Sequence, residues 1–159
     1  MKRHISSSHE FTGPWWVAAS LLRIEGPGLV VPVLEELHAQ LTRGTTVERA
    51  ATVECGALVR GESSVAMPVH WSDATHPGAF PEMQGEIRLV EHGDNVTDLE
   101  FTGEYEPPLG VLGAAGDTLA GHRVAEHTVD EAMVRLARAF EAAVSEHIGT
   151  PGHVTRSDA

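Results

Sequence analysis

The sequence GEYEPPLGVLGAAGDTLAGHRVAEHT, which spans Gly103–Thr128, marks the place where strand character gives way to helix character. Pro107 and Pro108 end the strand, because proline donates no hydrogen bond to a β-ladder. The same prolines suit the first turn of a helix, where the amide proton has no intrahelical partner. The stretch therefore predicts a short connection from the last strand of a sheet into a helix that starts near Pro108.

Small residues follow the prolines at close intervals. Gly110, Gly113 and Gly116 are three apart, and each weakens a helix by up to about 1 kcal/mol relative to alanine. On a helix they would fall on adjoining positions of one side. We interpret them as a face that packs closely against the sheet or a neighbouring chain, and a mobile loop over a pocket is the alternative.

An apolar stripe then predicts a long amphipathic helix as far as about Ile148. Its members recur at helical spacing and comprise Val129, Met133, Leu136, Phe140, Ala143 and Val144. Gly149, Pro151 and Gly152 end this helix, and we expect residues 149–159 to form a flexible tail.

Upstream of the prolines, apolar and polar residues alternate, which indicates half-buried strands. The alternation runs through Val53–Val59, Val65–Trp71, Ile87–Leu89 and Leu99–Tyr105. HGDN at His92–Asn95 has the residues of a tight hairpin turn. These segments predict several antiparallel strands.

The first third of the chain is less regular. Trp15–Ile24 is apolar on both parities, and we interpret it as a strand, with a short helix as the alternative, because EGPG at Glu25–Gly28 then breaks it. Leu29–Arg43 carries a stripe typical of a helix, in which Pro32 is tolerated only near the first turn. Residues 1–13 are polar, with three serines in a row, and we expect them to form a flexible tail.

This order of elements predicts an α+β fold in a single domain spanning residues 14–148. An antiparallel sheet of about five to seven strands would pack on the long C-terminal helix, with one shorter helix after the first strand. A sheet with one apolar face has to cover that face, and the last helix has the length and the stripe to do so.

The charge of the chain argues against several classes of partner. The 159 residues include 23 acidic and 11 basic ones, and the net charge of −12 at pH 7 repels phosphate backbones and anionic lipid heads. We expect no nucleic-acid partner and no membrane insertion, since no apolar run approaches the roughly 20 residues of a membrane helix. The start, MKRHISSSHE, has no apolar segment typical of a signal peptide, so we expect a cytoplasmic protein.

The single cysteine, Cys55, excludes an internal disulfide and a thiolate cluster for a metal. It lies on the apolar parity of its strand, which favours a small buried residue over a nucleophile. His122 and Glu126 are four apart, as are His127 and Glu131, a spacing that suits either a metal or an exposed ion pair. We favour the ion pairs and predict no metal and no cofactor.

Three segments carry a resemblance to a known family: AFPEMQGEIRLV at Ala79–Val90, TDLEFTGEYEPPLGVLG at Thr97–Gly113, and GHRVAEHTVDEAMVRLA at Gly121–Ala137. Together with the order of elements, they resemble a group of bacterial proteins in the START-related SRPBCC (polyketide cyclase/dehydrase-like) superfamily, over about residues 16–148. The resemblance implies a helix-grip fold, in which a curved antiparallel sheet wraps around the C-terminal helix and leaves a cavity between them. Members of this superfamily bind lipids, hormones, polyketides or other apolar molecules, and some are cyclases or hydrolases.

The function implied by this resemblance is the binding of a small apolar molecule, such as a lipid, a fatty acid or a polyketide-like compound. The residues expected to line its cavity are Val69, Trp71, Leu89, Phe101, Tyr105, Val129 and Met133. No catalytic residue is assigned.

Two alternatives remain open. A cyclase- or hydrolase-like enzyme would use His70, Tyr105, Asp117 and His122 as acid–base groups that converge on one point. A structural module without a ligand would form a homodimer through the glycine–alanine face at Gly110–Gly121.

Overall fold

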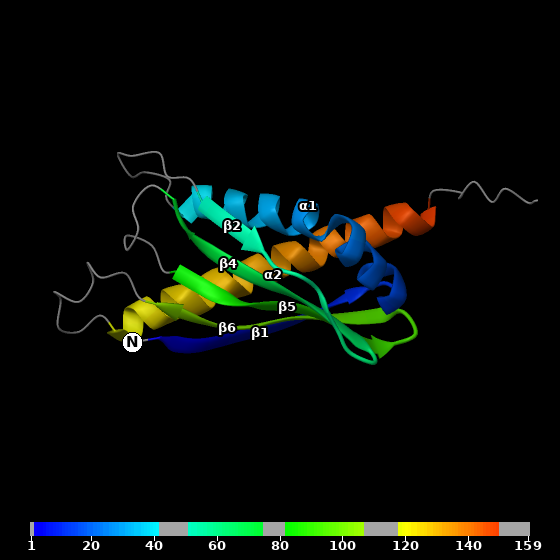
Figure 1. Ribbon diagram of the computed structural model, residues 1–159, viewed down its shortest axis with the longest axis horizontal. Coiled ribbons are helices and arrows are strands. Elements are labelled where there is room, and N and C mark those ends of the chain that lie inside the picture. The colour runs from blue at the N-terminus through cyan, green and yellow to red at the C-terminus, as the bar shows by residue number, and fades with distance from the viewer. Residues whose placement is uncertain (1, 42–50, 75–81, 107–117, 150–159) are drawn as a thin grey trace, which may run out of the picture.

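The computed structural model describes residues 2–41, 51–74, 82–106 and 118–149. Its elements follow one another as β1 (Arg3–Thr12), α1 (Trp15–Leu41), β2 (Ala51–Cys55), β3 (Val59–Arg60), β4 (Ser64–Asp73), β5 (Glu82–Gly93), β6 (Val96–Glu106) and α2 (Thr118–Gly149). The six strands form one antiparallel sheet in the order β1-β6-β5-β4-β2, with β3 paired to β4. Helix α2 runs along the length of the sheet, and α1 lies beside it (Figure 1). The expected α+β helix-grip layout is confirmed.

The prediction of a flexible tail over residues 1–13 is wrong, because Arg3–Thr12 forms the edge strand β1. This strand pairs with β6 over its whole length, from Arg3 opposite Tyr105 to Thr12 opposite Val96. Only Ile5 and Phe11 reach the core from β1, and the serines between them hide the alternation in the sequence. The folded domain therefore begins before residue 14.

The interpretation of Trp15–Ile24 as a strand is also wrong, because this segment is the first half of helix α1. The helix continues through Pro27 and Pro32, so Glu25–Gly28 does not break it and Pro32 is not confined to a first turn. Each proline removes one helical hydrogen bond, and such positions bend a helix, as α1 is bent in Figure 1. The expected helix at Leu29–Arg43 is confirmed as far as Leu41, where the described segment ends.

By length and hydropathy alone, Trp15–Ala39 of α1 would suffice to cross a membrane, with a mean hydropathy of 1.5, contrary to the sequence expectation. Core helices pass the same test, so this is weak evidence for a membrane span. In the structure α1 turns Val17, Leu22, Val30 and Leu34 into the core that it shares with the sheet and α2.

The strand expected at Val53–Val59 is divided in two. β2 ends at Cys55, which pairs with Val69, while β3 resumes with Val59 opposite Ala66. The register therefore slips by one residue between them, and such a slip turns side chains to the opposite face of a sheet. Val59 is consequently exposed.

The hairpin predicted at His92–Asn95 is confirmed, since Gly93 pairs with Val96 across a turn. β6 ends at Glu106, immediately before the two prolines, as expected. The region from Pro107 to Asp117, with the glycines at 110, 113 and 116, lies outside the described residues. α2 reaches Gly149, which confirms the predicted C-terminal helix over its described length.

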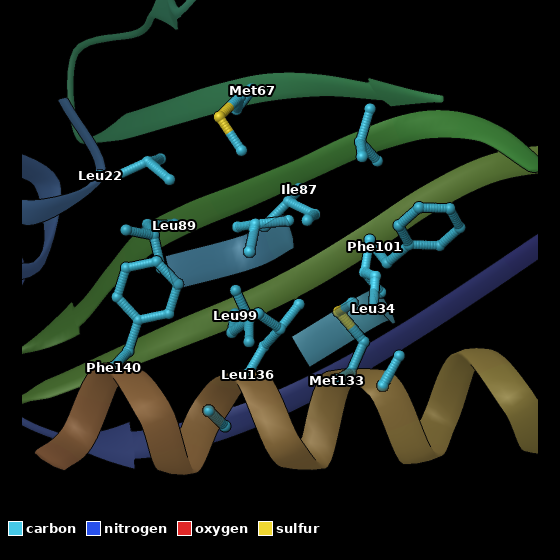
Figure 2. Packing of buried hydrophobic residues seen from close by; sticks show 14 of the residues in the cluster. Leu22, Leu34, Met67, Ile87, Leu89, Leu99, Phe101, Met133, Leu136 and Phe140 are labelled. Carbon is cyan, nitrogen blue, oxygen red and sulfur yellow. The ribbon is translucent and has the colours of Figure 1, made fainter. Parts of the chain in front are cut away.

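One continuous core fills the space between the inner face of the sheet and the two helices (Figure 2). Side chains of Ile87, Leu89, Leu99 and Phe101 rise from the sheet toward Met133, Leu136 and Phe140 of α2, while Leu22 and Leu34 enter from α1. The rings of Phe11 and Phe140 stack with their centroids 5.8 Å apart, which fixes α2 to the edge strand β1.

Two glycines face each other in the middle of the sheet, where Gly85 of β5 pairs with Gly103 of β6. A Cβ at Gly85 would lie 2.5 Å from the carbonyl oxygen of Thr102, and a Cβ at Gly103 would lie 2.5 Å from that of Gln84. The tip of the Phe101 ring would lie 2.9 Å from a Cβ at Gly85 and 3.0 Å from one at Gly103, which is also too close. The pair therefore allows a close approach of backbone to backbone that no larger residue permits.

We predict that Gly85→Ala or Gly103→Ala lowers the free energy of unfolding by about 1–3 kcal/mol, because the added methyl meets backbone that cannot rotate away. Chemical denaturation would measure the loss. Gly93→Ala is the matched control on β5, since a Cβ there meets nothing within 4 Å. Equal effects at Gly85 and Gly93 would contradict the close-approach argument.

Polar contacts also tie β1 to α2. Ser7 Oγ donates a hydrogen bond to Asp130 Oδ1 at 2.9 Å, and His9 Nε2 lies 2.7 Å from the same oxygen. Farther along, the Thr12 backbone amide donates to Glu141 Oε2 at 2.8 Å. The hydrogen bonds from His9 and then Ser7 hold the pKa of the Asp130 carboxyl below its usual value.

Because the pKa of Asp130 is lowered in the folded state, ionised Asp130 adds stability above its unfolded pKa, and that stability is lost as pH falls through the folded pKa. We predict that Asp130→Asn lowers the free energy of unfolding at neutral pH by less than about 1 kcal/mol, since the side chain is largely exposed. The difference from wild type should shrink as pH falls below the ordinary carboxyl range. Denaturant titrations across this range measure it, with Asp94→Asn in the hairpin turn as control, and a difference that is independent of pH would contradict the assignment.

Candidate functional site

A small apolar cavity lies between the sheet and the helices. Its lining comes from α1, β4, β5, β6 and α2 and consists of Leu34, Val69, Trp71, Met83, Ile87, Phe101, Val129, Ala132 and Met133. The cavity measures about 10 Å³, roughly the space of one water molecule. Pockets that hold small molecules usually measure roughly 300–1,000 Å³, so this core is nearly filled.

The position of the cavity follows from how α2 crosses the sheet. Among the described residues, the Cα atoms of α2 come within 8 Å of those of β1, β6 and α1, but not of those of β4 or β5. Helix α1 does come within this distance of both strands, and long side chains, including Met83 and Met133, fill the space between α2 and these strands. The cavity is the space that they leave between them.

The structure brings most of the predicted lining residues together. Five of the seven line the cavity: Val69, Trp71, Phe101, Val129 and Met133. Leu89 and Tyr105 are buried in the same core but do not reach the cavity. Contact of these side chains with a ligand remains a prediction.

A buried histidine and aspartate, which the sequence analysis missed, lie next to this core. His38 Nε2 is 3.1 Å from Asp73 Oδ2, and the two side chains are 0% and 1% exposed. The Trp71 ring, which lines the cavity, meets the His38 ring edge-on at a centroid distance of 6.2 Å. This pair joins the end of α1 to the end of β4.

The sequence did contain a signal for this pair. His38 follows Leu34 by four residues, so it belongs to the apolar stripe of α1. Asp73 follows Trp71 by two residues and therefore points inward like the other odd-numbered residues of β4. A polar residue at each of two inward positions predicts that they meet, since buried polar groups need partners.

An imidazole hydrogen-bonded to a carboxylate can take up or release a proton, but both side chains of this pair are almost completely buried. Neither His38 nor Asp73 lines the cavity. Cys55 is half-buried, and burial raises the pKa of its thiol, which disfavours the reactive thiolate. We therefore interpret the His38–Asp73 pair as a structural tie.

The acid–base groups proposed from the sequence do not converge. His70 lies on the outer face of the sheet, where Nε2 is 2.6 Å from Glu82 Oε1 and Nδ1 is 3.6 Å from Glu54 Oε2. Tyr105 is buried on the inner face. A site that combines His70 with Tyr105 is therefore wrong, because the two side chains leave opposite faces of the sheet. Asp117 and the side chain of His122 lie outside the described residues.

The described part of the chain also contains one group of metal-ligating side chains that the sequence analysis did not single out. Glu10, His92 and Asp98 offer ligand atoms within 4.8 Å of one another. His92 Nε2 lies 3.2 Å from Glu10 Oε1, and Nδ1 lies 2.8 Å from Asp98 Oδ2. His92 and Asp98 are six residues apart across the β5–β6 hairpin, but Glu10 on β1 is far from both in sequence, so spacing alone could not predict the cluster. Exposed ion pairs of this kind are common without a metal.

Glu131 pairs with Arg135 instead of with His127, the partner expected from the sequence. Arg135 Nε donates to Glu131 Oε1 at 3.1 Å along the exposed side of α2. His127 is exposed. The pairing at four residues is thus of the expected kind, with arginine in place of histidine.

Comparisons with known proteins support the fold alone. No protein-family model matches the chain, and no curated protein matches its sequence. A conserved protein from Geobacillus kaustophilus is 18% identical with a TM-score of 0.53, over 89% of this chain and 97% of that chain. A Mycobacterium smegmatis protein is 16% identical with a TM-score of 0.48, over 89% and 90% of the two chains.

Norcoclaurine synthase from Thalictrum flavum, in complex with dopamine and hydroxybenzaldehyde, is 12% identical with a TM-score of 0.44, over 92% of this chain and 88% of that chain. The last two likenesses are too distant to carry an argument about function. The helix-grip layout fits the superfamily to which the sequence segments pointed, while those segments and the bacterial group remain predictions.

We predict that His38→Leu or Asp73→Val alone lowers the free energy of unfolding by about 3–5 kcal/mol, because each leaves a buried polar partner behind. The double variant should lose much less than the sum, since it leaves neither group unpaired. Denaturation of the four proteins completes the cycle. His70→Leu, which removes an exposed histidine–carboxylate pair, should lose less than about 1 kcal/mol, and additive losses at His38 and Asp73 would contradict the tie.

Proposed function

We propose that the chain binds a small apolar molecule, such as a lipid, a fatty acid or a polyketide-like compound, between its sheet and α2. The observation that carries the proposal is the cavity at this place, whose described lining consists of apolar and aromatic side chains. Apolar cavities stay dry, and larger ones accept apolar molecules. Among the described lining residues only Trp71 has a polar side-chain nitrogen or oxygen, so the site would select by shape rather than charge.

Binding requires side chains to move, because the cavity of about 10 Å³ is far smaller than any such ligand. Methionine suits this movement, since its unbranched side chain adopts many shapes at little cost. Met83 and Met133 both line the cavity, and Met67 lies in the same core. The separation of α2 from β4 and β5 leaves Met83 and Met133 between the layers, which supports a site at this position.

The free energy needed to move the side chains is subtracted from the free energy of binding. The affinity therefore depends on how strongly the protein favours the ligand-free core, in which its own side chains fill the space. A ligand that replaces side-chain contacts one for one gains only the difference between two apolar environments. We therefore expect a flexible or flat apolar molecule to bind better than a bulky rigid one.

Nuclear magnetic resonance of protein with methyl-labelled methionine tests the proposal directly. Decanol and dihydroxyanthraquinone serve as uncharged probes, one flexible and one flat. We predict that at least one of them shifts the Met83 and Met133 methyl signals in a saturable way, while the Met1 signal stays in place. Titrations that move none of the core methionine signals would contradict the proposal.

Two matched variants on α2 locate the effect. Val129→Ile adds one methylene inside the cavity, and Val134→Ile adds the same group on the same helix away from the lining. We predict about tenfold weaker probe binding for Val129→Ile, because overpacking of about 1–3 kcal/mol has to be relieved before a ligand enters. Val134→Ile should bind like wild type, and equal affinities for all three proteins would place the probe elsewhere.

A further inference from the structure

A second hollow lies on the surface, between the first turns of α1 and the turn that joins β3 to β4. It is an open cleft of about 280 Å³. One wall comes from α1 and the other from β3, β4 and their turn, and the lining residues are Trp15, Trp16, Ala19, Ser20, Arg23, Arg60, Gly61, Ser64 and Val65. None of them lines the cavity beneath α2.

One large apolar side chain lines this cleft without being covered. Trp16, which is 66% exposed, stands in the cleft, whereas the exposed Ile24 and Val59 are not among its lining residues. The only other large hydrophobic residue so exposed in the described part of the chain is Ile148, near the end of α2. An uncovered indole in a hollow is typical of a binding site rather than of an inert surface.

The charge of the cleft is opposite to that of the protein. Arg23 and Arg60 both line it, and no carboxylate does. Among the described residues neither guanidinium forms an ion pair or a side-chain hydrogen bond, although acidic residues outnumber basic ones by 23 to 11. Guanidinium groups bind carboxylates through two parallel hydrogen bonds and keep their charge at any physiological pH.

We propose that this cleft binds a small aromatic monocarboxylate, whose ring packs on the Trp16 indole and whose carboxylate meets Arg23 and Arg60. The size of the cleft fits a fused ring with one acidic group, since it lies near the lower end of the usual range for small-molecule pockets. The charge of −12 on the whole chain disfavours a polyanion or an anionic membrane, because the repulsion grows with the charge of the partner and a single carboxylate carries only one. This inference is independent of the apolar ligand beneath α2.

Isothermal titration with naphthoate, and with naphthamide as its uncharged analogue, tests the proposal. Naphthoate should bind at one saturable site, and naphthamide should bind at least about tenfold more weakly. Arg23→Gln and Arg60→Gln should each weaken naphthoate binding about three- to tenfold, and Trp16→Ala by a similar factor. Arg138→Gln on α2 removes an equally exposed arginine elsewhere and should leave the affinity unchanged.

Circular dichroism of each variant establishes that it is folded, which is expected because Arg23, Arg60 and Trp16 are exposed. Equal affinity for naphthoate and naphthamide would overturn the proposal, as would wild-type affinity in both arginine variants. Loss of naphthoate binding in Val129→Ile with full binding in Arg23→Gln would assign the ligand to the cavity beneath α2 and overturn it as well. Binding of phosphatidylglycerol vesicles that naphthoate does not compete away would identify a membrane surface instead.

Discussion

The inner face of the sheet has to be covered, and the contact of α2 with β1 decides how. The Phe11–Phe140 stack, the Ser7 and His9 contacts to Asp130, and the Thr12 bond to Glu141 all fasten α2 to an edge strand. A helix held at one edge does not reach the middle of the sheet. Helix α1 lies over β4 and β5, and the residual cavity lies among the side chains of α1, α2 and the sheet that fill the space between them.

The elements that were predictable from the sequence are those whose energy comes from a regular apolar pattern. β4, β5, β6 and α2 each present one continuous face, so alternation or a helical stripe was sufficient to find them. β1 was missed because its own sequence lacks a regular apolar pattern, with only two side chains in the core. Pairing with β6 over ten residues and polar contacts to α2 stabilise the strand instead. Tertiary contacts here outweigh local composition.

The first part of helix α1 was missed for the opposite reason. Pro27 and Pro32 suggested a break, yet the apolar residues on both sides of them face one core, and burying that surface offsets the lost hydrogen bonds. Gly26 shows why the helix tolerates the irregular segment: a Cβ there would lie only 3.2 Å from the Met67 sulfur, so the small residue allows α1 close to β4. The strand at Val53–Val59 failed similarly, since a one-residue slip of register leaves no mark in the residues themselves.

For the candidate site, residue type and parity predicted burial well but could not predict volume. Val69, Trp71, Phe101, Val129 and Met133 do line one space, as expected, but whether that space is empty depends on the shapes of the neighbouring side chains and on where α2 is fastened. The same pattern could also have predicted the His38–Asp73 pair. Both residues occupy inward positions, and matching polar residues at such positions between different elements would have found it.

The two hollows differ in what a ligand must do to the protein. Entry beneath α2 requires the core to rearrange, and the contacts that oppose this are those that hold α2 to β1, so the stability of that fastening and the affinity of the inner site are parts of one free-energy balance. The surface cleft is built from α1, β3 and β4, which do not carry the contacts between α2 and β1. A ligand in this cleft would meet exposed side chains, so its affinity would be set by desolvation, charge and the ordering of those side chains rather than by opening of the fold.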